Sequence, residues 1–312
     1  MANYIRVSTI GMAPCEISQK PAGQDTTDYV LAHLQKNIEQ VLNDSPDLIV
    51  LPEACDRPKG MELEAQLAYY EERGDRVLHY LQAVARRHHC YVTYPAYQKM
   101  ADNTARNACM MLSREGKVLG SYYKNHLVID ETFESGILCG KEEMIFECDF
   151  GRVGAAICFD LNFEEIRKRL KQARPDLIVF PSAYHGGLMQ RFFAYDTRSY
   201  FVGAIVGEQS DIISPLGEKL AGSTNYFNYV TAEINLDYVL CHLDYNWEKL
   251  DAAKSKYGKK IKIHDPGYLG VVMITGESSD ITAGQVADEF EIELLDHYLT
   301  RALEHRANYT ER

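Results

Sequence analysis

The chain has 312 residues, of which 46% are hydrophobic and 25% charged, so it can fill the core of one large domain or two small ones. Its net charge of −12 repels phosphate backbones and anionic lipids, which argues against nucleic acid or a membrane surface as a partner. No apolar run approaches the ~20 residues of a membrane-spanning helix, and the N-terminus lacks the pattern of a signal peptide. These features predict a cytoplasmic protein.

Strands and helices alternate along the first part of the chain. In chain order, the expected elements are a strand at Tyr4–Ile10, a helix at 26–41, a buried strand at 47–52, a helical pattern at 61–87 and a strand at 90–94. Hairpins at 105–123 and 144–158, a helix at 162–172, a strand at 176–181, a helix at 188–199, a strand at 201–206, a hairpin at 212–220 and a strand at 229–234 follow.

The order of these elements predicts an α/β fold in which two packed sheets are flanked by helices. No linker or low-complexity tract divides the chain, so we expect one domain over residues 1–280 and a C-terminal helical extension over 281–312. The pattern weakens beyond about residue 238, and a plausible amphipathic helix spans 285–307.

Eight cysteines are scattered without a CxxC pair or a histidine at zinc-ligand spacing. In a reducing compartment such cysteines are mostly small buried side chains, so the pattern predicts neither a disulfide framework nor a metal site. A cysteine with a chemical role must therefore be recognised by its position.

Three reactive side chains each follow an apolar strand, and catalytic groups collect at the carboxyl ends of strands in α/β folds. Glu53 comes directly after the buried strand and is a candidate general base. Lys124 closes an alternating strand and can place a positive charge on a developing oxyanion. Taken singly, a surface glutamate and a sheet-edge lysine are the commoner interpretations.

Cys158 ends a run of small and apolar residues immediately before a helix. The positive N-terminal end of a helix stabilises a thiolate, and the backbone N–H groups after the cysteine can bind an oxyanion. Cys158 is therefore the strongest nucleophile candidate among the eight cysteines. Asp160 is interpreted as a helix cap rather than a catalytic group.

Together these segments resemble the nitrilase (carbon–nitrogen hydrolase) superfamily, whose hallmark is a Glu–Lys–Cys set in this order. The three motifs correspond to Leu51-Pro-Glu53, to the Gly-x-Tyr-x-Lys-x-His-Leu run from Gly120 to Leu127, and to the segment from Gly151 to Glu165. Weaker echoes of the family occur at Arg106-Asn-Ala108, Phe180-Pro-Ser-Ala183 and Ser214-Pro-Leu-Gly217. The resemblance covers about residues 4–236 and implies a four-layer αββα sandwich with two mixed sheets.

The resemblance also implies a mechanism. Cys158 attacks the carbonyl carbon, Glu53 moves the protons, and Lys124 with the backbone N–H of Phe159 stabilises the oxyanion of an intermediate that becomes a thioester. Neither a metal nor an organic cofactor is required. Cys158-Phe159-Asp160 favours an amidase or N-carbamoyl hydrolase over a nitrile hydrolase.

Many members of the superfamily carry a second glutamate between the lysine and the cysteine. Alignment on Gly136 and Gly140 selects Glu134, while Glu131 remains a rival. Tyr184 and His185 are candidate substrate-binding residues.

Three alternatives stay open. The same thioester can be passed to an amine by an acyltransferase, or the scaffold can be a catalytically idle binding protein. A Cys–His mechanism would need His126 or His185 to do the work of Glu53.

The resemblance further implies a homodimer or an assembly of dimers. The candidate interface helices begin near Asn162 and Leu188, and the second presents Leu188, Phe192, Phe193 and Tyr195. The C-terminal segment would reach across to the partner.

Overall fold

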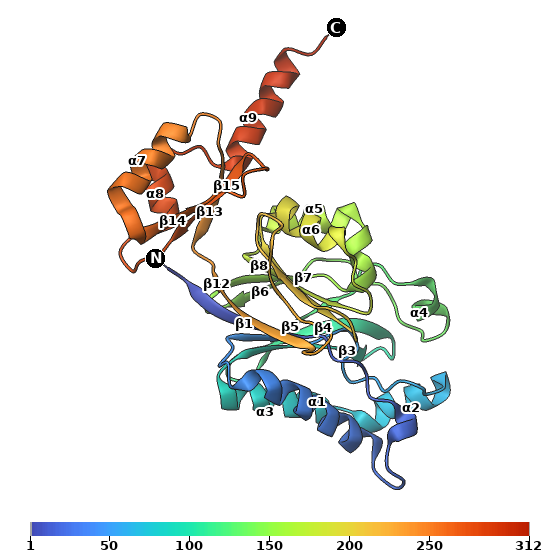
Figure 1. Ribbon diagram of the computed structural model, residues 1–312. Helices are drawn as coiled ribbons and strands as arrows, with labels where there is room; N and C mark the ends of the chain where they lie inside the picture. The colour runs from blue at the N-terminus through green and yellow to red at the C-terminus, as the bar shows by residue number, and fades with distance from the viewer. Residues whose placement is uncertain (1, 312) are drawn as a thin grey trace. The chain divides into compact units, whose positions relative to one another are not determined.

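A computed structural model describes residues 2–311 and divides into two compact units (Figure 1). The larger unit comprises residues 6–233, and the smaller comprises the residues up to Ile5 together with those from Ile234 onward. This division lies earlier than the boundary near residue 280 that we expected, because buried side chains from residues 241–274 pack with helix α8 (Ala283–Glu289) in a separate hydrophobic core. Within residues 2–311, no helix is both long enough and apolar enough to cross a bilayer.

The first sheet has the strand order β12-β1-β2-β3-β4-β5. Its strands are β1 (Tyr4–Ile10), β2 (Leu48–Val50), β3 (Tyr91–Lys99), β4 (Ala105–Leu112), β5 (Val118–Tyr123) and β12 (Tyr229–Asn235). The pairs β1–β2 and β2–β3 are parallel, whereas β3–β4 and β4–β5 are antiparallel. The sheet is therefore mixed, and β2 can be apolar throughout because it is buried on both faces.

Helices α1 (Thr26–Leu42) and α3 (Arg76–His88) pack against the outer face of the first sheet (Figure 1). The pattern that we read as one helix over 61–87 is two helices, because α2 (Leu63–Arg73) ends before Gly74. Gly74 has a φ of +48°, which interrupts a right-handed helix and which glycine adopts without a Cβ clash.

The second sheet has the strand order β11-β10-β9-β8-β7-β6. Its strands are β6 (Ile145–Cys148), β7 (Gly151–Ala155), β8 (Leu177–Ser182), β9 (Tyr200–Ile205), β10 (Asp211–Ile213) and β11 (Lys219–Gly222). Helices α5 (Glu164–Ala173) and α6 (Leu188–Thr197) cover its outer face (Figure 1). The inner faces of the two sheets meet, and the Thr9 hydroxyl donates to the carbonyl of Gly203 across the gap at 2.7 Å. The αββα sandwich expected from the sequence is thus confirmed.

The smaller unit contains a three-stranded antiparallel sheet in the order β13-β15-β14. Its elements are β13 (Tyr238–His242), α7 (Trp247–Tyr257), β14 (Ile261–His264), β15 (Val271–Gly276), α8 (Ala283–Glu289) and α9 (Leu295–Asn308). The single helix expected over 285–307 is interrupted between Glu289 and Leu295, and the strands after residue 238 were not expected. Only Leu295 of α9 is buried.

Candidate active site

The three reactive residues predicted from the sequence lie together in the larger unit. Glu53 follows β2, and Lys124 is the first residue after β5, so both come from strands of the first sheet. Cys158 is the first residue of a short 3-10 helix, Cys158–Asn162, that follows β7 of the second sheet. The site is therefore built where strand ends from both sheets meet, as expected for catalytic groups in this class of fold.

A buried ammonium lies between two carboxylates. The Lys124 side chain is almost fully buried, and its Nζ donates to Glu53 Oε1 at 3.0 Å and to Glu131 Oε2 at 2.7 Å. The Asn107 amide donates to the remaining Glu131 oxygen at 2.9 Å and to Glu53 Oε1 at 2.8 Å. Burial opposes the charge on Lys124, but the neighbouring acidic groups, above all the carboxylates of Glu53 and Glu131, outweigh it and raise the pKa of the lysine. Lys124 therefore stays charged at neutral pH.

The structure places Glu131, not Glu134, against Lys124. Glu131 lies in α4 (Ile129–Phe133), where its carboxylate also accepts from the backbone N–H of Val128 at 2.9 Å. Glu134 lies at the C-terminal end of the same helix with an exposed side chain. One helical turn carries the two residues, and the first of them is the one that points at the lysine. The contact with Lys124 therefore favours Glu131, the rival candidate, over the Glu134 selected by alignment on the two glycines.

The two glutamates provide a matched test. Glu131→Gln keeps the shape of the side chain but removes a charge that holds the Lys124 ammonium, so we expect turnover to fall by at least ~10-fold. Glu134→Gln should leave turnover within about twofold of wild type, because surface substitutions are usually nearly neutral. Steady-state rates of the two variants on one substrate decide the point, and the reverse order would reinstate Glu134.

The backbone of Cys158 is held in an unusual conformation. Its φ is +49°, which an L-residue other than asparagine or aspartate rarely adopts and which persists only when the surroundings enforce it. Asp160 accepts a hydrogen bond from the backbone N–H of Ile157 at 3.0 Å and so caps this turn, in agreement with the cap expected from the sequence. The sharp turn gives the sulfur its direction towards the Glu53–Lys124 pair.

Burial raises the pKa of the Cys158 thiol to about 12, with a further contribution from the negative charge of Glu53 and an opposing one from Lys124. The side chain is only 7% exposed. At neutral pH the resting sulfur is therefore a neutral thiol. It needs a base to become a nucleophile, and Glu53 is the carboxylate beside it.

The second oxygen of Glu53 is fixed as well. The backbone N–H of Ala183, just after β8, donates to Glu53 Oε2 at 2.9 Å and also interacts with the Cys158 sulfur. Glu53 thus has one oxygen on Lys124 and Asn107 and the other on Ala183. The carboxylate cannot rotate away from the thiol without losing three hydrogen bonds.

Neither candidate histidine is placed as a base for Cys158. The two nitrogens of His126 lie 3.1 Å from Asp160 Oδ1 and 2.8 Å from Glu165 Oε1, and its ring stacks on Phe163. The hydrogen bond with Asp160 raises the pKa of His126 despite burial. His185 Nδ1 accepts from the backbone N–H of Gly187 at 3.1 Å. Both histidines make structural contacts, which favours Glu53 over a histidine as the base for Cys158.

Two other predicted residues lie beside the nucleophile. Phe159 follows Cys158 in the first turn of the 3-10 helix, where backbone N–H groups have no acceptor within the helix. The Tyr184 hydroxyl accepts a hydrogen bond from Asn162 at 2.9 Å, and burial together with the Cys158 and Asp160 charges raises its pKa. The substrate-binding role expected of Tyr184 stays a prediction.

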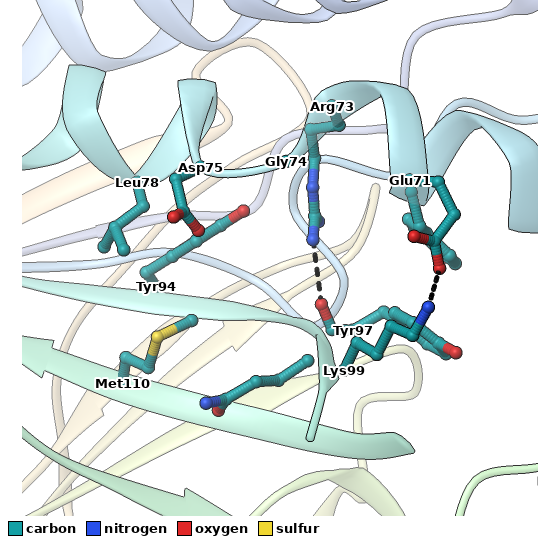
Figure 2. A pocket seen from close by; sticks show the side chains of 11 residues that line it. Glu71, Arg73, Gly74, Asp75, Leu78, Tyr94, Tyr97, Lys99 and Met110 are labelled. Carbon is teal, nitrogen blue, oxygen red and sulfur yellow. Dashed lines mark hydrogen bonds and ion pairs between the residues drawn. The ribbon is translucent and has the colours of Figure 1, made fainter. Parts of the chain in front are cut away.

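A separate hollow of about 290 Å³ contains none of the predicted catalytic residues (Figure 2). It is lined by α2 and the start of α3 on one side and by β3 and β4 on the other, with Arg73 reaching the carbonyl of Tyr97 and Lys99 paired with Glu71. Arg73 also forms a buried ion pair with Asp56, which accepts a hydrogen bond from the Tyr94 hydroxyl at 2.6 Å. This network anchors the chain three residues after Glu53.

Sequence reasoning missed the role of Asn107 and underrated that of Asp160. Asn107 belongs to the Arg106-Asn-Ala segment that we noted only as an echo of a family. A buried asparagine that donates to both Glu53 and Glu131 would have pointed to it, but neither burial nor these contacts are visible in the sequence.

Comparisons with known proteins bear on the family and the fold of the chain. Residues 6–240 match the family model described as carbon-nitrogen hydrolase. The omega-amidase NIT2 of Xenopus tropicalis is 25% identical over 232 residues, which cover 65% of this chain and 82% of that protein.

Two solved structures have a similar fold. Nit3 of Saccharomyces cerevisiae, a member of branch 10 of the nitrilase superfamily, aligns with a TM-score of 0.62 at 17% identity and covers 75% of this chain and 90% of its own. An amidase from Nesterenkonia sp. aligns with a TM-score of 0.63 at 15% identity and covers 74% and 90%. At these identities the likeness shows that the two-sheet sandwich is the same fold.

Proposed function

Because the chain belongs to the carbon–nitrogen hydrolase family, within the nitrilase superfamily, we propose that it hydrolyses a non-peptide C–N bond, an amide or N-carbamoyl group, of a small molecule. The observation that carries this proposal is the Lys124 ammonium held between Glu53 and Glu131 beside a neutral Cys158 thiol. This set contains a nucleophile, a base and a fixed positive charge, which are the three groups that acyl transfer to water needs.

The first half-reaction forms a thioester. Glu53 accepts the thiol proton as the Cys158 sulfur bonds to the carbonyl carbon, and the carbonyl oxygen becomes an oxyanion held by Lys124 and the N–H of Phe159. When the tetrahedral intermediate collapses, the C–N bond breaks and protonated Glu53 gives its proton to the leaving nitrogen. Loss of one oxyanion donor typically raises such a barrier by ~2.7–4 kcal/mol.

The second half-reaction consumes one water. Glu53 takes a proton from the water as its oxygen bonds to the thioester carbon, and collapse breaks the C–S bond. Glu53 then returns the proton to the sulfur, which restores the neutral thiol. Glu131 holds Lys124 through both steps and orients the substrate or the water.

A library assay tests the proposal. Ammonia release would be measured over linear amides, including ω-amides because a similar protein is an omega-amidase, and over N-carbamoyl compounds. We expect turnover within one of these classes by the wild type and none by Cys158→Ala. Mass spectrometry of the products separates hydrolysis from transfer of the acyl group to an added amine. Hydrolysis yields a free acid from an amide, and an amine with carbon dioxide from an N-carbamoyl compound. An inert wild type across the library would favour the idle binding protein.

We further propose a cytoplasmic homodimer or an assembly of dimers. On α6, Phe193 is buried against its own sheet, but Leu188 is 75% and Phe192 41% exposed, which leaves an apolar strip on the helix. We expect light scattering after size exclusion to give at least twice 35.5 kDa. Truncation at about residue 280 should weaken the assembly, because α9 exposes Leu299 and Leu303. A single species at the mass of one chain, at micromolar concentration, would disprove the proposal.

A further inference from the structure

Asp160 makes more hydrogen bonds than a helix cap requires. Its carboxylate is fully buried and receives four hydrogen bonds. Oδ1 accepts from the His126 backbone N–H at 2.8 Å and lies 3.1 Å from His126 Nδ1. Oδ2 accepts from the Tyr122 hydroxyl at 2.7 Å and from the Ile157 N–H at 3.0 Å. An asparagine, with one acceptor oxygen, could cap the turn but could not serve these donors on both sides.

The donors to Asp160 flank the two reactive residues. Tyr122 and His126 lie two positions before and two positions after Lys124, and Ile157 immediately precedes Cys158. Tyr122 belongs to β5 of the first sheet, while Ile157 follows β7 of the second. A single carboxylate therefore ties together the two chain segments that carry the oxyanion-binding lysine and the nucleophile.

We propose that Asp160 is a positioning residue that sets the placement of the Lys124 ammonium relative to the Cys158 sulfur. The hydrogen bond from Tyr122 connects Asp160 to the strand that ends just before Lys124. The part of this proposal that concerns turnover rests on the proposed hydrolase function. Glu53 and Glu131 fix the ammonium end of Lys124, and Asp160 fixes the backbone on either side of it. On the other segment, the bond to Ile157 holds the turn in which Cys158 has its strained φ.

The turnover test uses two variants and one control. Misplacement by about 1 Å typically costs ~10²-fold in rate, so we expect Asp160→Asn to lower kcat by about 10–100-fold and to leave KM within about threefold. Tyr122→Phe removes one hydroxyl and should lower kcat by about 5–20-fold in a protein that melts close to wild type. The control is Glu165→Gln, which changes the exposed partner on the far nitrogen of His126 and should stay within about twofold.

A double-mutant cycle separates positioning from general support of the fold. The rate constant for alkylation of Cys158 by iodoacetamide would be measured in the wild type, Tyr122→Phe, Lys124→Met and the double variant. If Tyr122 acts through Lys124, Tyr122→Phe slows labelling by about fivefold in the wild-type background. In the Lys124→Met background, the same replacement slows labelling by less than twofold. An equal effect in both backgrounds, or a wild-type kcat in folded Asp160→Asn, would overturn the proposal.

The labelling cycle needs no substrate, so it gives an answer even if the chain hydrolyses no amide. A wild type that is inert in the library assay but shows the expected labelling cycle would contradict the proposed function and leave the positioning role intact.

Discussion

Replacement of Cys158 by alanine is expected to abolish turnover and to leave the fold intact. The change removes one sulfur from a position that is already held by Asp160 through the neighbouring Ile157 N–H, so the turn keeps its anchor. Cys158→Ser should leave little activity. The thiol already has a pKa of about 12 in this buried position, and an alcohol in the same place is far harder to deprotonate. Initial rates and circular dichroism of the two variants are the measurements.

Alkylation gives an independent check on the nucleophile. One equivalent of iodoacetamide bound at Cys158, located by peptide mass spectrometry, should inactivate the protein. Cys139 is exposed and will also be labelled, so the experiment is best done in Cys139→Ser, which should turn over normally. Full turnover by protein that is labelled completely at Cys158 would refute the central claim.

Glu53→Gln and Lys124→Met are each expected to lower turnover by at least ~10². Glutamine has the shape of glutamate but cannot accept the thiol proton at neutral pH. Methionine keeps much of the lysine side chain but removes the positive charge that faces the oxyanion. Glu53, Lys124 and Cys158 act as one unit. The rate loss in the double variant Glu53→Gln/Lys124→Met should therefore be smaller than the product of the two single losses.

The stability of these variants must be measured alongside their rates. Removing one member of a buried ion pair can cost ~3–5 kcal/mol, since the other charge is left unpaired. Here Asn107 and Ala183 still donate to Glu53 when Lys124 is gone, so the cost should be smaller. Lys117→Met, at an exposed position before β5, is the matched control and should behave as wild type. If Glu53→Gln kept activity within tenfold of wild type, the base would have to be sought elsewhere, and His126 would be tested first.

The sequence predicted the sandwich because its strands have a clear signature. β2 and most of β8 are short apolar runs, and a strand buried on both faces leaves that pattern whatever surrounds it. The break at Gly74 was missed because the apolar spacing continues on both sides of it. The β-strands of the smaller unit were missed because that unit has a small core and polar, lysine-rich segments between its elements.

The reactive residues of the candidate site could be predicted from the sequence, but the residues that hold them in place could not. Glu53, Lys124 and Cys158 could be named because each follows a strand and each residue type has a defined chemical use. Glu131 and Glu134 are the same residue type one helical turn apart, so only the path of the backbone through α4 separates them. The proposed positioning role of Asp160 depends on hydrogen-bond donors from segments of both sheets, and contacts between such distant segments leave no local pattern in the sequence.

The first half of helix α9 contacts the rest of the smaller unit, whereas its second half is exposed. The Tyr298 hydroxyl donates to Asp244, its ring stacks on His242, and Arg301 pairs with Glu293, so the first half of the helix is fastened to its own unit. From Arg301 to Asn308 every residue is exposed. A free helical segment of this length is marginal in water, and amides whose helix opens without disturbing a core exchange quickly with solvent. Deuterium uptake in a single chain should therefore be slow up to about Arg301 and fast beyond it, so protection in the last two turns would report contact with another molecule.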